Sequence, residues 1–451
     1  MMTMILRWFL KGLAVTLTLL LIFLIFSIAP VDRKQASVHE SYKRMMNKFE
    51  GLDGVKVPPA TQAFNIGYSK INLTPDFPIS MGGYGSRRGK LYNSIRDSIF
   101  VRAIVINNGA QRVALVSADL LLIPPAVTEK LKSKLTTIGF SLNNTYLGAT
   151  HTHNSIGNWA GGAISFFYGS YQDSVVDHIS NKIVESIQLA ATNGKPSTLK
   201  SGVIPIAQAV KNRLVKGGPE DPLLRIIEIN RNDSSKLLLM SFAAHATCLS
   251  SKNLSLSRDY PGKLVDMLES KGYSFVMFMA GAVGSQACSS PKRGQSCIEW
   301  MADEISQTFL ANRNLLHEIQ DTSLLMLRVP LLLSDPQLKI ATDWKLRPWL
   351  FRMTIGESLV FLTGLRLGSV VMLGAPCDFS GEFSGQVDSF ASTRDLTSMV
   401  TSFNGGYIGY ITPINRYDVD HYETQLMNWY APGSGEYIAL SMEKLIEVLG
   451  N

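Results

Sequence analysis

Two histidines one residue apart are the first feature of this sequence that indicates chemistry. His151 and His153 form the tripeptide HTH directly after the apolar stretch NTYLGAT. In an extended segment, side chains two positions apart share one face, so both imidazoles are expected to point into one site. Gly157, Gly161 and Gly162 follow them, which suits a loop leaving the carboxyl end of a strand, where open α/β sheets tend to place ligands.

A third histidine has a similar setting. His245 lies at the end of LLLMSFAAHAT, which is predicted to be a strand running into a loop rich in Cys and Ser. Any one of the seven histidines, taken singly, is more simply a hydrogen-bonded core residue. Taken together, histidines at the ends of two predicted strands favour a metal site, because neutral imidazole is a common metal ligand.

The elements that must position these histidines alternate in the manner of an α/β protein. β-branched runs predict buried strands and amphipathic runs predict helices, with no repeat and no low-complexity linker between them. The predicted strands are FVRAIVIN, RVALVSADLLLI, LLRIIEINR, KLLLMSFAAHAT, FVMFMAGAVG and SVVMLGAP, and the predicted helices are AVTEKLKSKLTTIG, GKLVDMLESKG and the closing GSGEYIALSMEKLIEVLG. We expect one α/β domain over residues 61–451, with mixed β-sheets flanked by helices.

The N-terminal segment decides where this domain is located. The stretch GLAVTLTLLLIFLIFSIAPV carries no charge over about 20 residues, the length that a helix needs to cross a bilayer. Arg7 and Lys11 precede it, so the rest of the chain is expected on the extracytoplasmic side. Residues 1–32 are therefore predicted to be a transmembrane anchor. A cleavable signal peptide is the alternative, because residues 27–29 (SIA) resemble a cleavage site.

Residues 33–60 are predicted to be a stalk or linker. RKQASVHESYKRMMNKFE is polar and helix-forming, and GLDGVKVPP then supplies Gly and Pro breakers. The net charge of +7, from 43 basic and 36 acidic residues, is modest and forms no basic block, so no nucleic-acid partner is expected.

The four cysteines suggest at most one small disulfide loop. Cys288 and Cys297 lie close together in CSSPKRGQSC, where either a disulfide or two free thiols is expected. Cys248 and Cys377 are expected to be buried as small hydrophobic residues.

Six segments, in order along the chain, resemble successive motifs of the neutral/alkaline (non-lysosomal) ceramidase family. They are NIGYSKINLTPDFPISMGGYG, VSADLLLIP, GATHTHNSIG, AAHATCLSSKNLSLSRDYPG, GAPCDFSGEF and YIGYITPINRYDVDHYE, and they run from about Phe64 to Glu423. The resemblance implies a neutral-ceramidase-like catalytic domain, a lipid substrate, and hydrolysis of the amide bond of ceramide-like N-acyl lipids. Neither the acyl-chain preference nor the oligomeric state follows from these motifs.

The resemblance also implies a catalytic Zn2+ ion bound by two histidines, a carboxylate and a tyrosine. Matched residue by residue, these ligands fall on His151, His245, Asp378 and Tyr410, with Tyr407 as a competing tyrosine. Zinc accepts imidazole nitrogen and carboxylate oxygen, and it lowers the pKa of a bound water to roughly 7.

Three further residues receive roles through the same resemblance, and Asp259 receives one from its position before a predicted helix. His153 would move protons, and Arg213 and Tyr422 would bind the substrate or polarise its carbonyl. Asp259, in SRDYPG, would orient His245 or cap the following helix.

The sequence departs from the family's pattern at two site positions. A serine at the family's catalytic centre falls on Gly284, and whether its neighbour Ser285 replaces it stays open. The family's glutamate ligand falls on Asp378, which is one methylene shorter, so either Asp378 or Glu382 is expected to reach the metal. No segment is expected to correspond to the family's usual C-terminal immunoglobulin-like domain.

These departures leave two alternative functions. One is a zinc amidase or esterase with a non-sphingolipid substrate, and the other is a catalytically weak membrane-tethered binding protein. The stretch DWKLRPWLFRM (343–353) mixes aromatic and basic residues that would suit a bilayer interface. We expect it instead to form an edge strand with its aromatic side chains packed inward.

Overall fold

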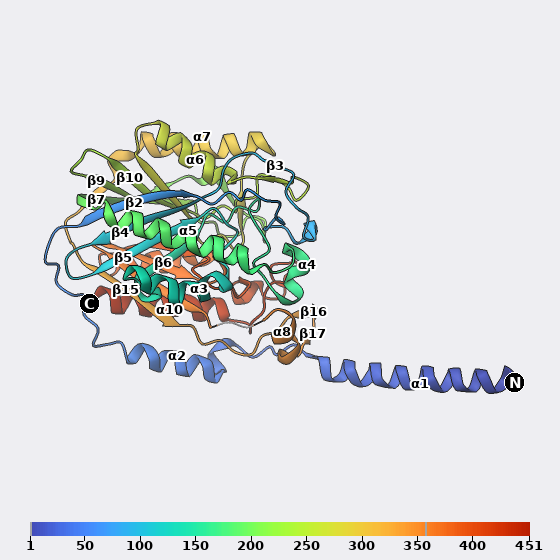
Figure 1. Ribbon diagram of the computed structural model, residues 1–451. Helices are drawn as coiled ribbons and strands as arrows, with labels where there is room; N and C mark the ends of the chain where they lie inside the picture. The colour runs from blue at the N-terminus through green and yellow to red at the C-terminus, as the bar shows by residue number, and fades with distance from the viewer. Residues whose placement is uncertain (1, 357–358) are drawn as a thin grey trace.

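A nine-stranded mixed sheet runs through the protein in the computed structural model, which describes residues 2–356 and 359–451 (Figure 1). Its neighbouring strands are, in order, β12 (Phe275–Ala280), β10 (Lys236–Phe242), β9 (Leu223–Arg231), β7 (Lys195–Pro205), β2 (Asn65–Asn72), β4 (Phe100–Asn107), β5 (Arg112–Ala118) and β6 (Thr145–Ala149), and β14 (His317–Ile319) pairs with β7. The β5–β6 and β10–β12 pairs are parallel and the others antiparallel. The predicted mixed α/β fold is confirmed.

A second sheet of four strands faces the first, and short strand pairs lie around them. The second sheet has the order β15 (Leu324–Pro330), β18 (Phe361–Leu367), β19 (Val370–Ala375) and β21 (Thr397–Ser402). The short pairs are β20 (Asp378–Phe379) with β22 (Tyr410–Ile411), β13 (Gln286–Cys288) with β8 (Val210–Asn212), and β11 (Ser255–Leu256) with β3 (Ser94–Ile95).

Single strands of both sheets serve two hydrophobic cores, because successive side chains on a strand point to opposite faces. On β4, Ala103 and Val105 pack under helices, whereas Ile104 and Ile106 enter a central core. Val370 and Met372, on β19 of the second sheet, enter that same core, whereas the alternate residues of β19 pack toward other helices. The central core therefore lies between the two sheets and holds them together.

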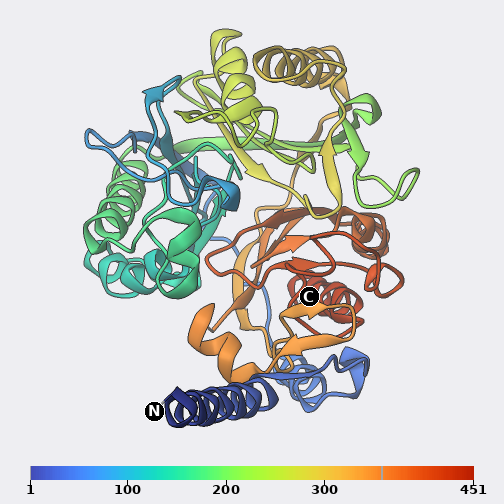
Figure 2. The same ribbon diagram turned by 90° about the vertical axis from the view of Figure 1, so that its right-hand side faces the viewer.

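Three pairs of helices cover the outer faces of the two sheets (Figure 2). They are α3 (Pro125–Lys134) with α5 (Asp173–Thr192), α6 (Asp259–Ser270) with α7 (Gln295–Ala311), and α9 (Ser384–Ser392) with α10 (Ser434–Gly450). The nine strands and helices predicted from periodicity all occur at their expected places, because a long one-sided apolar pattern must be buried against a neighbour.

α1 (Met2–Ser27) projects from the body as a long apolar helix (Figure 1). Within the part of the chain that the structure describes, it is the one helix with the length and composition to cross a membrane. A signal sequence would pass the same test, so the anchor stays a prediction.

The segment expected to be a stalk contains α2 (Glu40–Glu50), which packs on the body. Met45 and Phe49 of this helix are buried in the core under α10. Residues 33–60 are thus attached along the surface in this structure rather than extended away from it.

The aromatic stretch at 343–353 differs from the expectation of an inward-packed edge strand. β17 (Trp344–Leu346) is short, and α8 (Pro348–Thr354) follows it with Pro348 in its first turn, where proline favours the start of a helix. Phe351 is buried, but Trp344 and Trp349 are 51% and 44% exposed. The expectation was wrong because the proline ends the strand before its alternation can bury these rings.

The disulfide joins Cys248 to Cys297, not Cys288 to Cys297. Cys288 lies on β13, where its thiol donates to the carbonyl of His245, and Cys377 is a buried free thiol. The expectation failed because α7 carries Cys297 back beneath the loop after β10. Closeness in sequence did not indicate which sulfurs meet.

Candidate metal centre and active site

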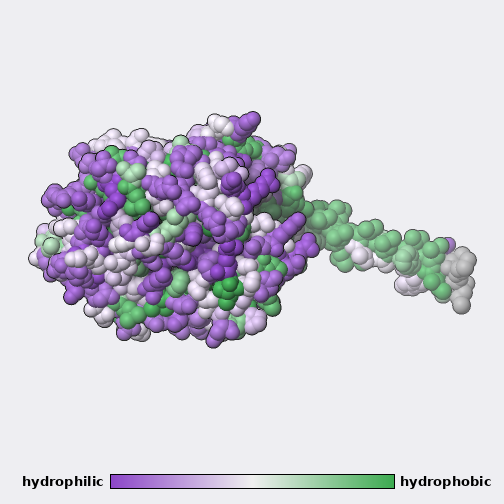
Figure 3. Space-filling view, turned by 90° about the horizontal axis from the view of Figure 1, so that it is seen from above, coloured by the Kyte–Doolittle hydropathy of each residue, from purple (hydrophilic) through white to green (hydrophobic). Residues whose placement is uncertain are grey.

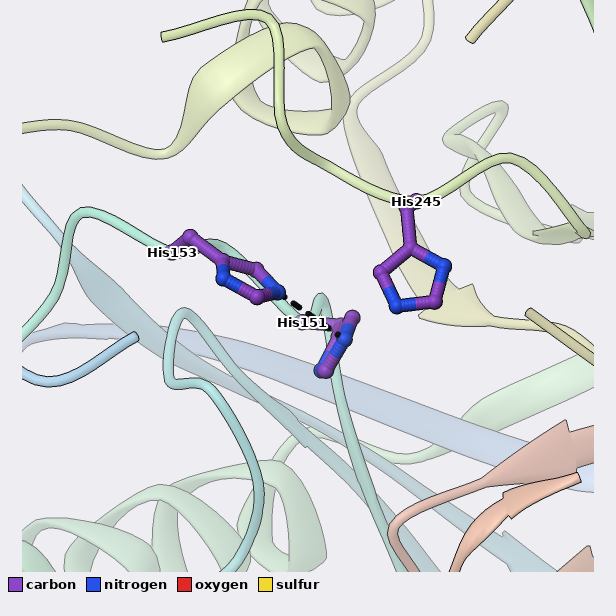
Figure 4. Close-up of side chains that lie close together, drawn as sticks. All are labelled: His151, His153 and His245. Carbon is purple, nitrogen blue, oxygen red and sulfur yellow. Dashed lines mark hydrogen bonds between the residues drawn. The ribbon is translucent and has the colours of Figure 1, made fainter. Parts of the chain in front are cut away.

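His151 and His153 meet in a turn just beyond the end of β6. Their Nε2 atoms are 3.1 Å apart, and their rings are edge to face with centroids 4.7 Å apart (Figure 4). His151 has a φ of 60°, so the backbone there is left-handed rather than extended. The predicted convergence of the two imidazoles is present, but it arises from a turn and not from a shared strand face.

His245 approaches the same point from the end of β10. Its ring centroid lies 4.7 Å from that of His151 and 5.8 Å from that of His153. His245 Nδ1 is 2.9 Å from the carbonyl oxygen of Gln286, and His151 Nδ1 is 2.7 Å from that of Leu121. A carbonyl can only accept, so each Nδ1 carries the proton and each Nε2 presents a lone pair to the centre.

The carboxylate of Asp378 completes this group. Its Oδ1 lies 3.5 Å from His151 Nε2 and 3.2 Å from His245 Nε2, and it has no hydrogen-bond donor among the described residues. The Tyr407 hydroxyl donates to the other oxygen, Oδ2, at 2.8 Å. Glu382, the alternative carboxylate, accepts instead from the guanidinium of Arg416.

The donor set fits a zinc ion. Burial lowers the pKa of His151 and of His245 to about 3, so both rings are neutral near pH 7, and burial raises the pKa of Asp378. The two Nε2 atoms and the carboxylate oxygen therefore converge in a buried space, where, among the described residues, His153 Nε2 and Arg213 Nη2 are the donors within reach of the nitrogens and the oxygen has none. A buried carboxylate oxygen without a donor is costly unless a cation or a proton lies beside it, and nitrogen with carboxylate oxygen is a ligand set that zinc accepts.

Tyr410 and Arg213 lie beside His245. The β20–β22 pairing sets Tyr410 beside Asp378, and the Tyr410 hydroxyl is 3.2 Å from His245 Nε2. Arg213 Nη2 donates to His245 Nε2 at 2.9 Å and to the Tyr410 hydroxyl at 3.2 Å. Burial alone would lower the pKa of Arg213, but Tyr410 and Glu423 raise it above its usual value, so the guanidinium stays charged.

Glu423 is a site residue that the sequence analysis did not single out. It is fully buried, and its Oε1 accepts from Arg213 Nε at 2.6 Å while Oε2 accepts from the backbone N–H of Ser285 at 3.0 Å. Its neighbour Tyr422 is 47% exposed, with its ring 5.7 Å from Tyr410. The signal from which Glu423 could have been found is its position directly after Tyr422 in the segment DVDHYE.

Gly284 cannot carry a side chain in this backbone. A Cβ there would lie 2.6 Å from the carbonyl oxygen of Asp378, which is backbone and cannot yield cheaply. Ser285 has a φ of 61°, and its hydroxyl pairs with Ser380 at 3.0 Å and accepts from Gln286 at 2.9 Å. The structure thus places the candidate Ser285 in a hydrogen-bonded turn beside the histidine group.

Three side chains that were not predicted from the sequence contact His151 or His153. Phe403 stacks on His151 with centroids 4.0 Å apart, and Tyr84 leans on His153 at 4.8 Å. Arg87, buried, donates to the carbonyl of His153 at 2.5 Å. Aromatic and arginine residues are too common in sequences for such contacts to be read from one chain.

Asp259 acts on the loop after His245 and not on its ring. Its carboxylate accepts from the backbone N–H groups of Tyr260 at 2.7 Å, Leu249 at 3.1 Å and Cys248 at 3.3 Å. Of the two roles considered for Asp259, the one toward His245 is carried out on the backbone of its loop, and in α6 the carboxylate reaches one N–H of the first turn, that of Tyr260.

Comparison with known proteins supports the family resemblance. The family model described as neutral/alkaline non-lysosomal ceramidase, N-terminal, matches residues 64–284. Neutral ceramidase of Pseudomonas aeruginosa is 27% identical over 219 residues, or 44% of this chain and 32% of that protein. Neutral ceramidase of Mycobacterium tuberculosis is 25% identical over 202 residues, or 40% of this chain and 32% of that protein. The predicted resemblance is confirmed, over a region about a third as long as these curated relatives.

Structural comparison extends the match toward the C-terminus. The crystal structure of the Pseudomonas aeruginosa neutral ceramidase superposes with a TM-score of 0.72 at 18% identity, covering 84% of this chain and 74% of that one. A structure titled as ceramidase complexed with C2 gives the same values. At this identity the likeness shows a common fold. The family match includes His151, His245 and Gly284 but ends before Asp378 and Tyr410.

Proposed function

We propose that this chain is a zinc-dependent amidohydrolase that cleaves the amide bond of ceramide-like N-acyl lipids. The observation that carries the proposal is that the unpaired Asp378 Oδ1 lies 3.5 Å from His151 Nε2 and 3.2 Å from His245 Nε2. The family match and the shared fold support the choice of reaction and substrate class.

In this proposal, His151, His245, Asp378 and Tyr410 hold the zinc ion. Bound there, zinc would supply a nucleophile near neutral pH by lowering the pKa of a coordinated water to roughly 7. Tyr407 fixes the rotation of the Asp378 carboxylate through its hydrogen bond, so the free oxygen faces the histidines.

The neighbouring residues handle the substrate and its protons. His153, next to His151 and close to Tyr84, takes up and releases protons during amide cleavage. Arg213, held by Glu423, offers N–H donors to the carbonyl oxygen of the substrate as negative charge develops on it. Tyr422, half exposed above Tyr410, contacts the substrate at the entrance.

The location follows from the same proposal. α1 anchors the chain in a membrane, and residues 61–451 form the catalytic domain on the extracytoplasmic side. The apolar, exposed surface of α1 and the basic residues Arg7 and Lys11 before its apolar stretch support this orientation. A membrane-held enzyme would meet its lipid substrate at the bilayer surface.

The test is turnover of a fluorescent N-acyl sphingosine by the purified full-length chain in detergent, with and without a chelator. We expect one equivalent of zinc by elemental analysis, loss of turnover on chelation, and recovery when zinc is added back. His151→Ala should lose both zinc and turnover. Turnover that ignores the chelator and the substitution would contradict the proposal.

A second candidate is supported by Gly284, where the family's serine is missing. A zinc amidase or esterase acting on a non-sphingolipid substrate would keep the metal group and tolerate this change. Parallel assays with lipid amides, peptide amides and esters separate the two, since the second candidate predicts the faster reaction on a substrate other than the lipid amide. Zinc below about half an equivalent, with no turnover of any substrate, would indicate instead a membrane-tethered binding protein.

A further inference from the structure

The carboxyl end of α1 is fixed to the body rather than joined to it by a linker. β1 (Ile28–Pro30) follows α1 directly and pairs antiparallel with β17. The Arg347 N–H donates to the carbonyl of Ser27 at 2.8 Å, and the Trp349 Nε1–H donates to the carbonyl of Phe26 at 2.7 Å. Because these bonds hold the backbone at the end of the helix, the direction of α1 sets the orientation of the body.

The side of the body from which α1 projects exposes large apolar side chains. We call it the anchor face and define it by six side chains that are 40–66% exposed: Phe166, Phe167, Ile340, Trp344, Trp349 and Met353. They come from α4 (Ser165–Tyr168), from the hairpin of β16 (Lys339–Ala341) and β17, and from α8, which all lie at the end of the body where α1 emerges (Figures 1 and 2). A Cβ on Gly162 would lie 2.8 Å from the carbonyl oxygen of Thr354, so the short turn η5 (Gly162–Ile164), which leads into α4, is in contact with α8.

The apolar surface of α1 continues to this end of the molecule. Seen from above, the hydrophobic surface runs along α1 up to the body, whose visible face is mostly hydrophilic (Figure 3). Between α1 and the hairpin lies an open apolar groove of about 420 Å³, lined by Leu24, Ile25, Ile28, Ile340, Ala341 and Trp344. Its apolar lining would contact an acyl chain and gives water few hydrogen-bond partners.

The anchor face borders the histidine site. A Cβ on Gly85 would lie 3.1 Å from the ring of Phe167, so the turn η2 (Gly85–Arg87) packs directly beneath this exposed phenylalanine. Tyr84, the next residue back, leans on His153 with ring centroids 4.8 Å apart. Only Gly85 and Tyr84 separate an apolar side chain of the anchor face from a histidine of the site.

A second connection runs through the hairpin. Lys339 on β16 is buried, and its Nζ donates to the carbonyls of Tyr417 and Thr424, each at 2.9 Å. The loop between those two carbonyls carries Tyr422 and Glu423, which contact Arg213 beside His245. The hairpin that supports this loop is the same one that exposes Ile340 and Trp344 beside α1.

We propose that the anchor face lies on the outer surface of the bilayer that α1 crosses, so that the lipid substrate enters the site from the membrane and not from water. The proposal rests on α1 being an uncleaved anchor, as proposed above. Its partner is the lipid surface itself: tryptophan with neighbouring arginine is the composition of membrane interfaces, and α1 delivers this face to one.

Quenching of tryptophan fluorescence by brominated lipids tests directly whether the anchor face lies against the bilayer. The full-length chain, reconstituted in vesicles, has six tryptophans, of which Trp8 lies in α1 and Trp344 and Trp349 on the anchor face. We expect Trp344→Phe and Trp349→Phe each to lower the quenchable share, from about three rings in six to about two in five. Trp300→Phe, a control on α7, should raise that share, because it removes a ring held away from lipid.

The quenching experiment distinguishes a failure of the proposed anchor α1 from a failure of the proposed contact between the anchor face and the bilayer. If Trp8→Phe raises the quenchable share as Trp300→Phe does, Trp8 is not quenched, α1 is not in the bilayer and the proposed anchor fails. If Trp8 is quenched and the anchor-face tryptophans are not, the anchor stands and the apposition is wrong.

Activity provides a second test that does not depend on fluorescence. The double variant Phe166→Ser/Phe167→Ser changes exposed side chains, so folding should be retained. We expect it to slow turnover of a bilayer-embedded N-acyl lipid at least about tenfold and to leave turnover of a water-soluble short-chain analogue within about twofold. Leu315→Ser, 42% exposed after α7, is the matched control. Equal slowing on both substrates would overturn the proposal, whereas absence of turnover in the unmodified chain would count against the proposed function.

Discussion

Two buried polar groups lie side by side in this protein and differ in one respect. The histidine group consists of His151, His153, His245 and Asp378, and the turn group consists of Ser285, Gln286 and Ser380, with Asp378 and Ser380 only two positions apart. In the turn group, the hydroxyls and the amide pair with one another.

In the histidine group, the Nε2 atoms have donors within reach, but one carboxylate oxygen has none in the part of the chain that the structure describes. His151 Nε2, His245 Nε2 and Asp378 Oδ1 converge, and the carboxylate oxygen has no donor among the described residues. A buried polar group whose atoms all have partners holds the fold together, whereas one that leaves a buried carboxylate oxygen unpaired beside two imidazole nitrogens suits a cation. The difference separates a structural turn from a candidate active centre without reference to any relative.

Asp378→Asn should have the largest effect, because the new amide supplies a hydrogen-bond donor, so that the position of the unpaired Asp378 oxygen in the histidine group is paired, like the atoms of the turn group. The amide keeps the shape of the carboxylate and adds a donor toward the histidine Nε2 atoms. We expect loss of zinc and a fall in turnover of at least about a thousandfold. We also expect the zinc-free protein to become more stable, by about 1 kcal/mol in the free energy of unfolding.

The checks are elemental analysis, the turnover assay, and chemical denaturation in the presence of chelator. Ser380→Ala is the control, since it removes a hydroxyl from the turn group and should leave zinc content unchanged. Full zinc content in Asp378→Asn would break the distinction between the two groups.

Tyr407→Phe should weaken zinc binding by the histidine group without abolishing it. The loss of the 2.8 Å hydrogen bond to Asp378 Oδ2 frees the carboxylate to rotate. We expect zinc affinity to fall about 10- to 100-fold, as is typical when a group that orients a metal ligand is removed. Competition with a chromophoric chelator measures this affinity. Tyr437→Phe, which loses a comparable bond to Leu332 elsewhere, should bind zinc like the unmodified chain, and equal weakening in both would contradict the assignment.

Gly284→Ser restores the residue type that the family resemblance implies at this position. Because a Cβ would meet the Asp378 carbonyl at 2.6 Å, we expect the free energy of unfolding to drop by about 1–3 kcal/mol, measured as a lower thermal midpoint. Increased turnover without loss of stability would show instead that this backbone accepts a serine at the centre.

Ser285→Ala should have the smallest effect. The hydroxyl contributes two hydrogen bonds inside the turn group, so we expect a loss of about 1 kcal/mol in stability and turnover within about tenfold of the unmodified chain. Denaturation and the turnover assay together check this. A fall of a thousandfold in turnover with intact stability would identify Ser285 as a reacting group and would merge the two groups into one centre.

The elements of the fold were predictable because their signals are local. The β-branched apolar runs of β4 and β9, and the apolar stripe of α6, are carried by residues that are neighbours in the chain. The stretch at 343–353 was misjudged because Pro348 starts a helix before the alternation can decide which rings are buried. The cysteine pairing was misjudged because it depends on how α7 returns to the loop after β10.

By itself, the sequence determined the apolar N-terminal helix, the alternation of strands and helices, and two histidine positions at strand ends. These follow from hydropathy and periodicity, which act over a few residues. Tertiary structure alone decided that Asp378 and not Glu382 faces the imidazoles, and that Tyr407 orients this carboxylate while Tyr410 lies beside His245. Those choices depend on the pairing of β20 with β22, whose residues are some thirty positions apart, and no local pattern encodes the meeting of such distant segments.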